Sequence, residues 1–398
     1  DKANDALRVD APELRVKVVG EGANLGLTQA GRIAFARNGG RINTDAIDNS
    51  AGVDSSDHEV NIKILTGGAI QSGALKAEDR NALLASMTEE VGDKVLAHNY
   101  DQTLAISLQE RNAVVELNAQ ERFMKALEAE GKLNRKVEGL PDSTAVAELA
   151  AAGRGLTRPE IAVLTAYSKL ELSDDIVASK APEDPFFERT LVGYFPDPLA
   201  KFEAEMKRHR LRRDIVATVL ANDIVNMAGA TFPERLKASA ECDDTCLVIA
   251  FEAARRVFRL DEAWDAVNAL DLKIPADAQL ALQKEIATVL RRQTFWLARG
   301  KAQTRGKGGK ITVQGFIDAY RDAADALRAA GGSVLSRFEQ AKLAERQQAL
   351  VDLGAPEELA RTVAMLKPLT ATRDIADLAR AHRWPEPEMA RLYHQVGA

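Results

Sequence analysis

The chain has 398 residues and a net charge of −6, with 46% hydrophobic and 28% charged residues, proportions typical of a globular protein. The acidic total disfavours a dedicated nucleic-acid binder, which is usually basic. The only two cysteines, Cys242 and Cys246, exclude a disulfide framework and favour a reducing, cytoplasmic setting. No signal peptide or apolar run of membrane-spanning length is evident, so we expect neither a membrane nor a nucleic-acid partner.

The first part of the chain shows strand and helix signals in alternation. Residues 16–19 form a β-branched run that ends at a glycine, which predicts a buried strand. Thr28 is expected to cap a helix that runs to about Asn38, and residues 42–44 predict a second short strand. A further helix is expected from about residue 51 to the glycine pair at 67–68. This order is typical of a parallel α/β unit.

Beyond residue 68 no convincing strand pattern occurs, and apolar residues recur at helical spacing. Thr157-Arg-Pro-Glu160 predicts a capping box at a helix start. Residues 182–198 contain four prolines, so they are expected to form a packed connector between helical groups rather than one helix. The predicted helices are a pair within 79–130 and single helices at about 199–229, 245–260, 275–299, 312–329, 333–353, 356–366 and 373–382.

Candidate binding residues follow both predicted strands. Gly20-Glu-Gly-Ala-Asn24 has closely spaced glycines, which let a backbone approach a cofactor, and an amide that both donates and accepts. Residues 45–56 concentrate Asp, Asn and Ser at a helix start, where one or two would suffice for N-capping. Since parallel strand ends meet at one edge of a sheet, the two segments predict a ligand crevice there.

Other candidates are weaker. Cys242-x-x-x-Cys246 has no second ligand pair, so we expect core or surface thiols and no metal site in the chain. His58 is the one histidine in the candidate site stretch, and for it a capping or surface position is favoured over a functional role. The basic run 207–213 predicts a solvated helix face that pairs with acidic neighbours, rather than a nucleic-acid or phosphate site. Residues 305–310 predict a mobile basic loop, since they lack the Walker pattern.

Three stretches together carry a resemblance to a known family. They are Glu21-Gly-Ala-Asn24 with the run Gly40-Arg-Ile-Asn-Thr-Asp-Ala-Ile-Asp-Asn-Ser-Ala-Gly-Val-Asp-Ser-Ser-Asp-His-Glu-Val-Asn-Ile-Lys-Ile64, Leu156-Thr-Arg-Pro-Glu-Ile-Ala-Val-Leu-Thr-Ala-Tyr-Ser-Lys169, and Leu211-Arg-Arg-Asp-Ile-Val-Ala-Thr-Val-Leu-Ala-Asn222. The chain thereby resembles the C-terminal portion of the large bacterial NAD-specific glutamate dehydrogenases. The resemblance implies a mainly α-helical chain. Residues 1–68 would be the distal half of a Rossmann-like cofactor domain. Residues 69–398 would form an all-helical region, with a possible sub-boundary at 182–198.

The resemblance also implies roles for individual residues. Asn24 matches the asparagine beside the nicotinamide ribose, and Asn49 matches the one near the nicotinamide and the α-amino and carboxylate groups of the substrate. Ser56 matches the serine that helps bind the side-chain carboxylate of glutamate. The remaining residues implied to bind NAD are Gly20, Glu21, Gly22 and Ala23. Smaller members of the family read Asn-Ala-Gly-Gly where this chain has Asn49-Ser-Ala-Gly52, so the local backbone is expected to differ.

The implied reaction is reversible oxidative deamination of L-glutamate to 2-oxoglutarate and ammonia. The lysine, the acid/base carboxylate and the Gly-rich pyrophosphate loop that this chemistry needs find no match in this chain. We therefore expect no catalytic residue in this chain and no activity without the remainder of a longer parent protein. We also expect the parent protein to be a homo-oligomer. The competing hypothesis is a helical interaction or regulatory module without catalysis. Whether Asn24, Asn49 and Ser56 converge discriminates between the two hypotheses.

Overall fold

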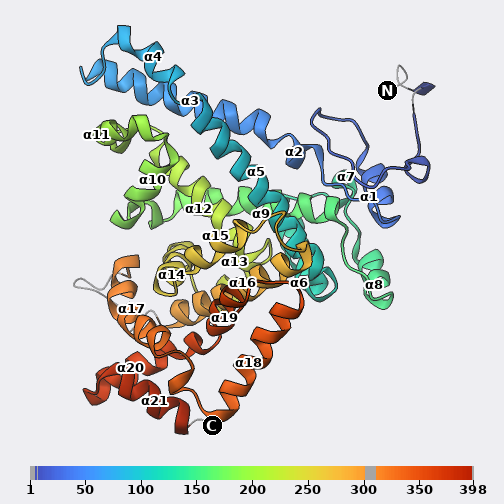
Figure 1. Ribbon diagram of the computed structural model, residues 1–398. Helices are drawn as coiled ribbons and strands as arrows, with labels where there is room; N and C mark the ends of the chain where they lie inside the picture. The colour runs from blue at the N-terminus through green and yellow to red at the C-terminus, as the bar shows by residue number, and fades with distance from the viewer. Residues whose placement is uncertain (1–4, 7, 301–310, 397–398) are drawn as a thin grey trace. The chain divides into compact units, whose positions relative to one another are not determined.

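The computed structural model describes residues 5–6, 8–300 and 311–396, and its contacts divide the chain into two compact units (Figure 1). Unit 1 comprises Asp1–Ala178 and Phe187–Arg235, and unit 2 comprises Ser179–Phe186 and Leu236–Ala398. The chain thus passes from one unit to the other and back close to the predicted Pro-rich connector. The loop predicted at 305–310 lies outside the described residues.

The prediction of a mainly helical chain is confirmed, but the Rossmann-like half is not seen. Among the described residues the two predicted strands make only one isolated parallel bridge, between Val18 and Arg41. The Val19 N–H donates to the Arg41 carbonyl at 3.0 Å, and the Arg41 N–H donates to the Lys17 carbonyl at 2.9 Å. Parallel strands need covered faces and further partners. Val16 and Val18 are instead 55% and 65% exposed, so their side chains supply no core for a sheet.

Unit 1 is built from helices that pack around a central one. Its helices are α1 (Gln29–Arg37), α2 (Asp45–Asp48), α3 (Ser50–Gln71), α4 (Arg80–Ala85), α5 (Thr88–Arg111), α6 (Ala113–Ala129), α7 (Arg135–Glu138), α8 (Ser143–Ala151), α9 (Arg158–Ala178), α10 (Glu188–Tyr194), α11 (Glu203–Lys207), α12 (Arg212–Ala228) and the start of α13 (Phe232–Ala240). The central helix α9, green in Figure 1, packs against α12, α5 and α1. Its buried Ile161 and Leu164 join Ile106 of α5 and Met124 of α6 in one core.

The helix signals near the start of the chain are largely confirmed. Thr28 caps α1, with its hydroxyl oxygen accepting the Gly31 N–H at 3.1 Å. Helix α3 does not end at Gly67–Gly68 as predicted but continues to Gln71. Leu65 and Ala69, on either side of the glycine pair, are 1% and 0% exposed. Their burial stabilises the helical backbone that the glycines alone would disfavour.

The predicted capping box is only partly as expected. The Glu160 carboxylate reaches back to the Thr157 N–H at 2.7 Å, as the box requires. The Thr157 hydroxyl, however, donates to that same carboxylate at 2.6 Å rather than to a backbone group. Glu160 is 1% exposed, so the pairing also satisfies a buried acid at the start of α9.

The connector between residues 182 and 198 is not a single helix, which confirms the prediction from its prolines. It consists of the 3₁₀ helix η4 (Ala181–Glu183), the 3₁₀ helix η5 (Pro185–Phe187), α10 and the start of η6 (Asp197–Phe202). Phe187 and Phe195 are 1% and 2% exposed. These aromatic rings anchor a segment whose prolines cannot supply helical hydrogen bonds.

The helix predicted at 199–229 is interrupted between α11 and α12, and His209 lies at the break. This residue is 4% exposed, and its Nδ1 accepts the Leu211 N–H at 3.1 Å. Its Nε2 consequently carries the proton and donates to the Asn61 carbonyl at 3.1 Å. The basic run 207–213 therefore spans a break rather than one helix face. Its ion pairing is as expected, since Lys207 contacts Glu203 at 2.9 Å.

Unit 2 is entirely helical in its described residues. Beyond the end of α13 it contains α14 (Asp244–Val257), α15 (Leu260–Asn268), α16 (Ala276–Arg299), α17 (Val313–Ala330), η7 (Gly331–Val334), α18 (Arg337–Asp352), α19 (Glu357–Met365), η8 (Pro368–Ala371), α20 (Thr372–His382) and α21 (Glu386–Val396). Helix α14 packs on α16 and α17. The predicted helices of this unit are present to within a few residues, whereas α13, α15 and α21 were not predicted.

Among the residues that the structure describes, no single helix is both long and apolar enough to cross a membrane. Only α12 and α13 taken together, with a bend of 90° between them, pass that test.

Candidate functional site

The loop that follows residue 19 is held in place by a buried ion pair between Glu21 and Arg32. Arg32 lies on α1, and its Nε and Nη2 contact the two Glu21 carboxylate oxygens at 2.6 and 3.0 Å. The same carboxylate accepts the Leu27 N–H at 3.0 Å, which closes the loop on itself. Glu21 and Arg32 are 4% and 6% exposed. Removing one partner of such a pair leaves an uncompensated buried charge, so the pair fixes the loop.

Two aspartates of the short helix α2 hold the same loop through its backbone. Asp45 accepts the Leu25 N–H at 2.9 Å and lies 3.2 Å from Arg32 Nη2. Burial alone would raise the pKa of the Asp45 carboxyl, but the Leu25 N–H and the Arg32 charge hold it below its usual value. Asp48 accepts the Glu21 N–H at 2.9 Å. The carboxylates of the polar turn therefore position the loop as well as starting a helix.

This arrangement brings two of the predicted site residues together. The Asn49 amide Nδ2 donates to Asn24 Oδ1 at 3.0 Å, so the loop and the start of α3 meet at these side chains. Asn24 is exposed and Asn49 is half-buried. An amide side chain carries two donor hydrogens and one acceptor oxygen. The pairing thus leaves the Asn24 amino group and the Asn49 oxygen to bind a ligand.

Ser56 does not bond to either asparagine but lies on the same side of α3 as Asn49. Its exposed hydroxyl donates to the Val53 carbonyl at 2.7 Å. Seven residues separate Asn49 from Ser56, which amounts to two helical turns, or about 10 Å along the axis. Gly52 lies between them, and a Cβ there would come within 2.9 Å of Asn49 Oδ1. The glycine therefore leaves room beside the asparagine on this face of the helix.

Three of the four remaining predicted cofactor residues, Gly20, Gly22 and Ala23, are exposed on the loop, and the fourth, Glu21, is buried. Gly22 and Ala23 are exposed, and a Cβ placed at Gly20 or Gly22 would meet nothing within 4 Å. A ligand can thus approach this backbone closely. The Glu21 side chain is directed inwards and occupied by Arg32. The binding of a cofactor by Gly20, Glu21, Gly22, Ala23, Asn24 and Asn49, and of a substrate by Asn49 and Ser56, stays a prediction.

A second layer behind the loop was not predicted from the sequence. Arg158, at the start of α9, donates from Nε and Nη2 to Asn43 Oδ1 at 3.1 and 2.9 Å. The Asn43 amide in turn donates to Asp48 at 2.9 Å. Arg158 Nη1 also contacts Glu110 of α5 at 2.9 Å. In the sequence, Arg158 lies inside the predicted capping box between Thr157 and Glu160. That position is the one local signal that could have identified it.

The structure also places two further candidates from the sequence, the cysteine pair and His58. Cys242 and Cys246 are buried thiols, which confirms the core alternative. His58 is 0% exposed and stacks on Tyr194 with ring centroids 4.5 Å apart. The prediction that His58 lies on the surface or caps a helix is therefore wrong, because α3 turns this residue into the packed interior of unit 1.

Comparisons with known proteins agree with the resemblance. A family model described as "Bacterial NAD-glutamate dehydrogenase, catalytic domain" matches residues 1–109, and one described as "Glutamate dehydrogenase, C-terminal" matches residues 153–398. The NAD-specific glutamate dehydrogenases of Halomonas elongata and Pseudomonas aeruginosa are 41% and 43% identical to this chain over all of its length. That of Mycobacterium tuberculosis is 37% identical over 78% of the chain and 19% of its own length. The chain spans about a quarter (24%) of the length of the first two relatives. On these matches, the chain belongs to the family of bacterial NAD-specific glutamate dehydrogenases.

Proposed function

We propose that this chain serves in the NAD-dependent oxidative deamination of L-glutamate to 2-oxoglutarate and ammonia, as part of a longer glutamate dehydrogenase. The observation that carries the proposal is the hydrogen bond from Asn49 to Asn24. It joins the two amides that the family resemblance assigns to the nicotinamide side of the cofactor. The names of the relatives support NAD as that cofactor and glutamate as the substrate.

The described residues fit the nicotinamide half of NAD. The Asn24 amino group would donate to the ribose, and the open backbone at Gly22 would let the cofactor approach the loop. Asn49 would orient the nicotinamide and the α-amino and carboxylate groups of glutamate. The hydroxyl of Ser56 would turn from Val53 towards the distal carboxylate of the substrate. When bound, NAD would supply the hydride acceptor, and these side chains would hold glutamate beside it.

The rest of the catalytic machinery would come from the remainder of the longer protein. We propose that the lysine that activates water and the acid/base carboxylate reside there, as does the pyrophosphate loop. Residues 1–68 would then contribute to a cofactor domain, and residues 69–398 would form a helical region with a sub-boundary at 182–198. The helical region would brace the catalytic part and contact other copies of the subunit. The thiols Cys242 and Cys246 support a reducing, cytoplasmic setting.

The test is glutamate-dependent NADH formation by the longer protein, with other amino acids as controls. We expect activity selective for glutamate. Asn49→Ala should lower kcat/KM about 10- to 100-fold, because a hydrogen bond to a charged group is worth about 1.5–3 kcal/mol. Asn38→Ala is the matched control, since Asn38 is an exposed asparagine at the C-terminal end of α1 and is not among the predicted site residues. A folded protein without activity towards any amino acid would favour the helical interaction module instead.

A further inference from the structure

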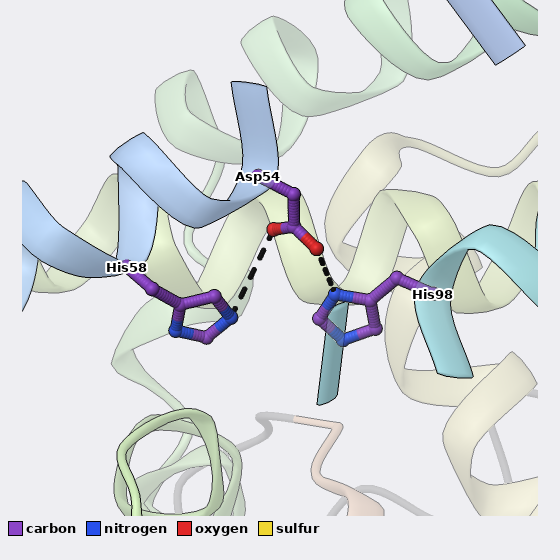
Figure 2. A group of neighbouring side chains, drawn as sticks. All are labelled: Asp54, His58 and His98. Atoms are coloured by element: carbon purple, nitrogen blue, oxygen red, sulfur yellow. Dashed lines mark hydrogen bonds and ion pairs between the residues drawn. The ribbon is translucent and has the colours of Figure 1, made fainter. Parts of the chain in front are cut away.

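Three side chains from two helices of unit 1 point towards one another away from the Asn24–Asn49 pair. Asp54 and His58 lie on α3, and His98 lies on α5, which packs beside it (Figure 2). One Asp54 oxygen is 2.7 Å from His98 Nδ1, and the other is 3.8 Å from His58 Nε2. The three potential ligand atoms all lie within 4.8 Å of one another.

His58 is the unusual member of this group, since its polar atoms are buried without hydrogen bonds. The residue is 0% exposed, and neither ring nitrogen has a hydrogen-bond partner among the described residues. A buried polar group left without a partner costs about 1–3 kcal/mol. The Tyr194 ring covers one face of the imidazole at 4.5 Å, but stacking does not satisfy its nitrogens. The Nε2 atom is directed at Asp54 from beyond hydrogen-bond distance (Figure 2).

We propose that Asp54, His58 and His98 bind a divalent transition-metal ion, with Zn²⁺ the species best suited to them. Zinc takes imidazole nitrogens at about 2.0–2.1 Å and carboxylate oxygens at about 2.0–2.2 Å. Ligand atoms around one tetrahedral zinc ion therefore lie about 3.4 Å apart. The present separations, which reach up to 4.8 Å, would have to close by up to about 1.4 Å on binding, while the 2.7 Å contact between Asp54 and His98 would open. The ion would displace the proton between Asp54 and His98 and give His58 Nε2 the partner it lacks.

The ligand set favours a transition metal over magnesium or calcium. Two imidazoles and one carboxylate suit zinc and its neighbours, whereas Mg²⁺ and Ca²⁺ prefer oxygen ligands. The His98 side chain is 47% exposed, so a water molecule can reach the fourth position. Lys94 is a cationic side chain whose charge acts on the His58 imidazole. Its Nζ is directed to the Gly193 carbonyl at 3.0 Å and lies 3.8 Å from Glu90, so other groups already hold its ammonium.

The position of the group on α3 separates it from the proposed substrate face. Asp54 and His58 are each two residues from Ser56, which at 100° per residue places them about 160° round the helix from it. A metal at this site would not touch glutamate. It would tie α3 to α5, because His98 is the one ligand on the second helix. The ion would then act as a brace that holds the helix bearing Asn49 and Ser56 in a fixed rotation.

This proposal departs from the expectation that the chain holds no metal. The spacing of Asp54 and His58, i and i+4 on a helix, is a local signal of two ligands on one face. The third ligand, His98, stands 44 positions from Asp54, so the sequence alone does not join it to them. The packing of α5 on α3 does.

The experiment measures Zn²⁺ binding to the full-length protein after chelator treatment, by titration calorimetry and by the visible spectrum of bound Co²⁺. We expect one zinc ion bound through these ligands and a rise in Tm on adding it. His98→Ala should weaken binding at least about tenfold, since even an outer-shell change costs that much. Because His98 is exposed, its replacement should leave the fold intact. Asp54→Asn is the second variant, since it keeps the shape of the side chain and removes its charge.

His382→Ala is the matched control, because His382 is an exposed histidine in unit 2. It should bind Zn²⁺ as the unaltered protein does and show the same Co²⁺ spectrum. Equal zinc affinity in the unaltered protein and in both His98→Ala and Asp54→Asn would overturn the proposal. So would the absence of zinc binding by the unaltered, folded protein. Neither readout uses catalytic activity, so the result is independent of the proposed reaction.

Discussion

Arg158 donates two hydrogen bonds to the side-chain oxygen of Asn43, at 3.1 and 2.9 Å, although the two residues lie 115 positions apart. The Asn43 amide then holds Asp48, and Asp48 holds the backbone of Glu21. A helix of the central core of unit 1 thus reaches the candidate cofactor loop through two side chains. The conformation of the loop therefore depends on α9 as well as on the sequence of the loop.

Arg158→Met should loosen the loop through this relay. The methionine keeps the apolar stem of the side chain but loses the hydrogen bonds to Asn43, Ser107 and Glu110. We expect the free energy of unfolding to fall by about 1.5–3 kcal/mol, the range for hydrogen bonds to a charged group. Urea unfolding gives the measurement. Arg154→Met, at an exposed position nearby, should change stability little, and equal losses in the two variants would contradict the relay.

Glu21→Gln should be more costly, because the variant removes the closer of the two carboxylates that face the buried Arg32 guanidinium and leaves it only Asp45, at 3.2 Å. Breaking a buried pair on one side typically costs about 3–5 kcal/mol. The change should appear in the unfolding free energy and as faster proteolysis within residues 20–28. Glu78→Gln serves as the control, since the Glu78 side chain is 78% exposed and its ion pair with Lys76 is long, at 3.9 Å. A loss below about 1 kcal/mol for Glu21→Gln would show that water reaches the pair.

Ser56→Ala tests the proposed contact with the substrate carboxylate. In the longer enzyme the KM for glutamate should rise about tenfold, the equivalent of one hydrogen bond to a charged group, while the KM for NAD stays unchanged. The adjacent exposed Ser55 provides the control, because Ser55→Ala alters a hydroxyl about 100° away on the helix. If both variants kept the KM of the unaltered enzyme, Ser56 would be removed from the substrate site.

Lys169 should make stability depend on pH in the alkaline range. Its Nζ is buried, and burial lowers the pKa of Lys169 from 10.5 to about 8 against the opposing influence of Asp101 and Asp223. Between about pH 8 and 10.5 the unfolded chain holds a proton that the folded chain has lost. The contribution of Lys169 to the unfolding free energy therefore rises with pH across that window and is smallest below pH 8.

The matching experiment compares the unaltered protein with Lys169→Met by urea unfolding at pH 7 and pH 10. Other lysines titrate in both proteins, so their effect cancels in the difference. The stability of the variant relative to the unaltered protein should be higher at pH 7 than at pH 10. A difference that is the same at both pH values would mean that the ammonium keeps its ordinary pKa in the fold.

Most of the helical architecture was predictable because its signals are local. The Thr28 cap and the contact of Glu160 with Thr157 both join groups three residues apart. The break at His209 escaped prediction, and one of the two contacts that hold its imidazole is with Asn61, which stands 148 positions away. The parallel sheet was wrongly expected for a related reason. A β-branched run indicates a strand only where neighbouring strands and covering helices complete it.

By itself the sequence determined that the chain is mainly helical, where several helices begin or end, most of them in unit 2, and which asparagines and serine carry the family pattern. Helical periodicity and capping are encoded within a few residues, so tertiary contacts need not be known. Only the tertiary structure decided that Asn24 meets Asn49, that Arg158 supports the loop through Asn43, and that His98 joins Asp54 and His58. These contacts join residues 25, 115 and 44 positions apart, and their formation depends on how whole helices pack.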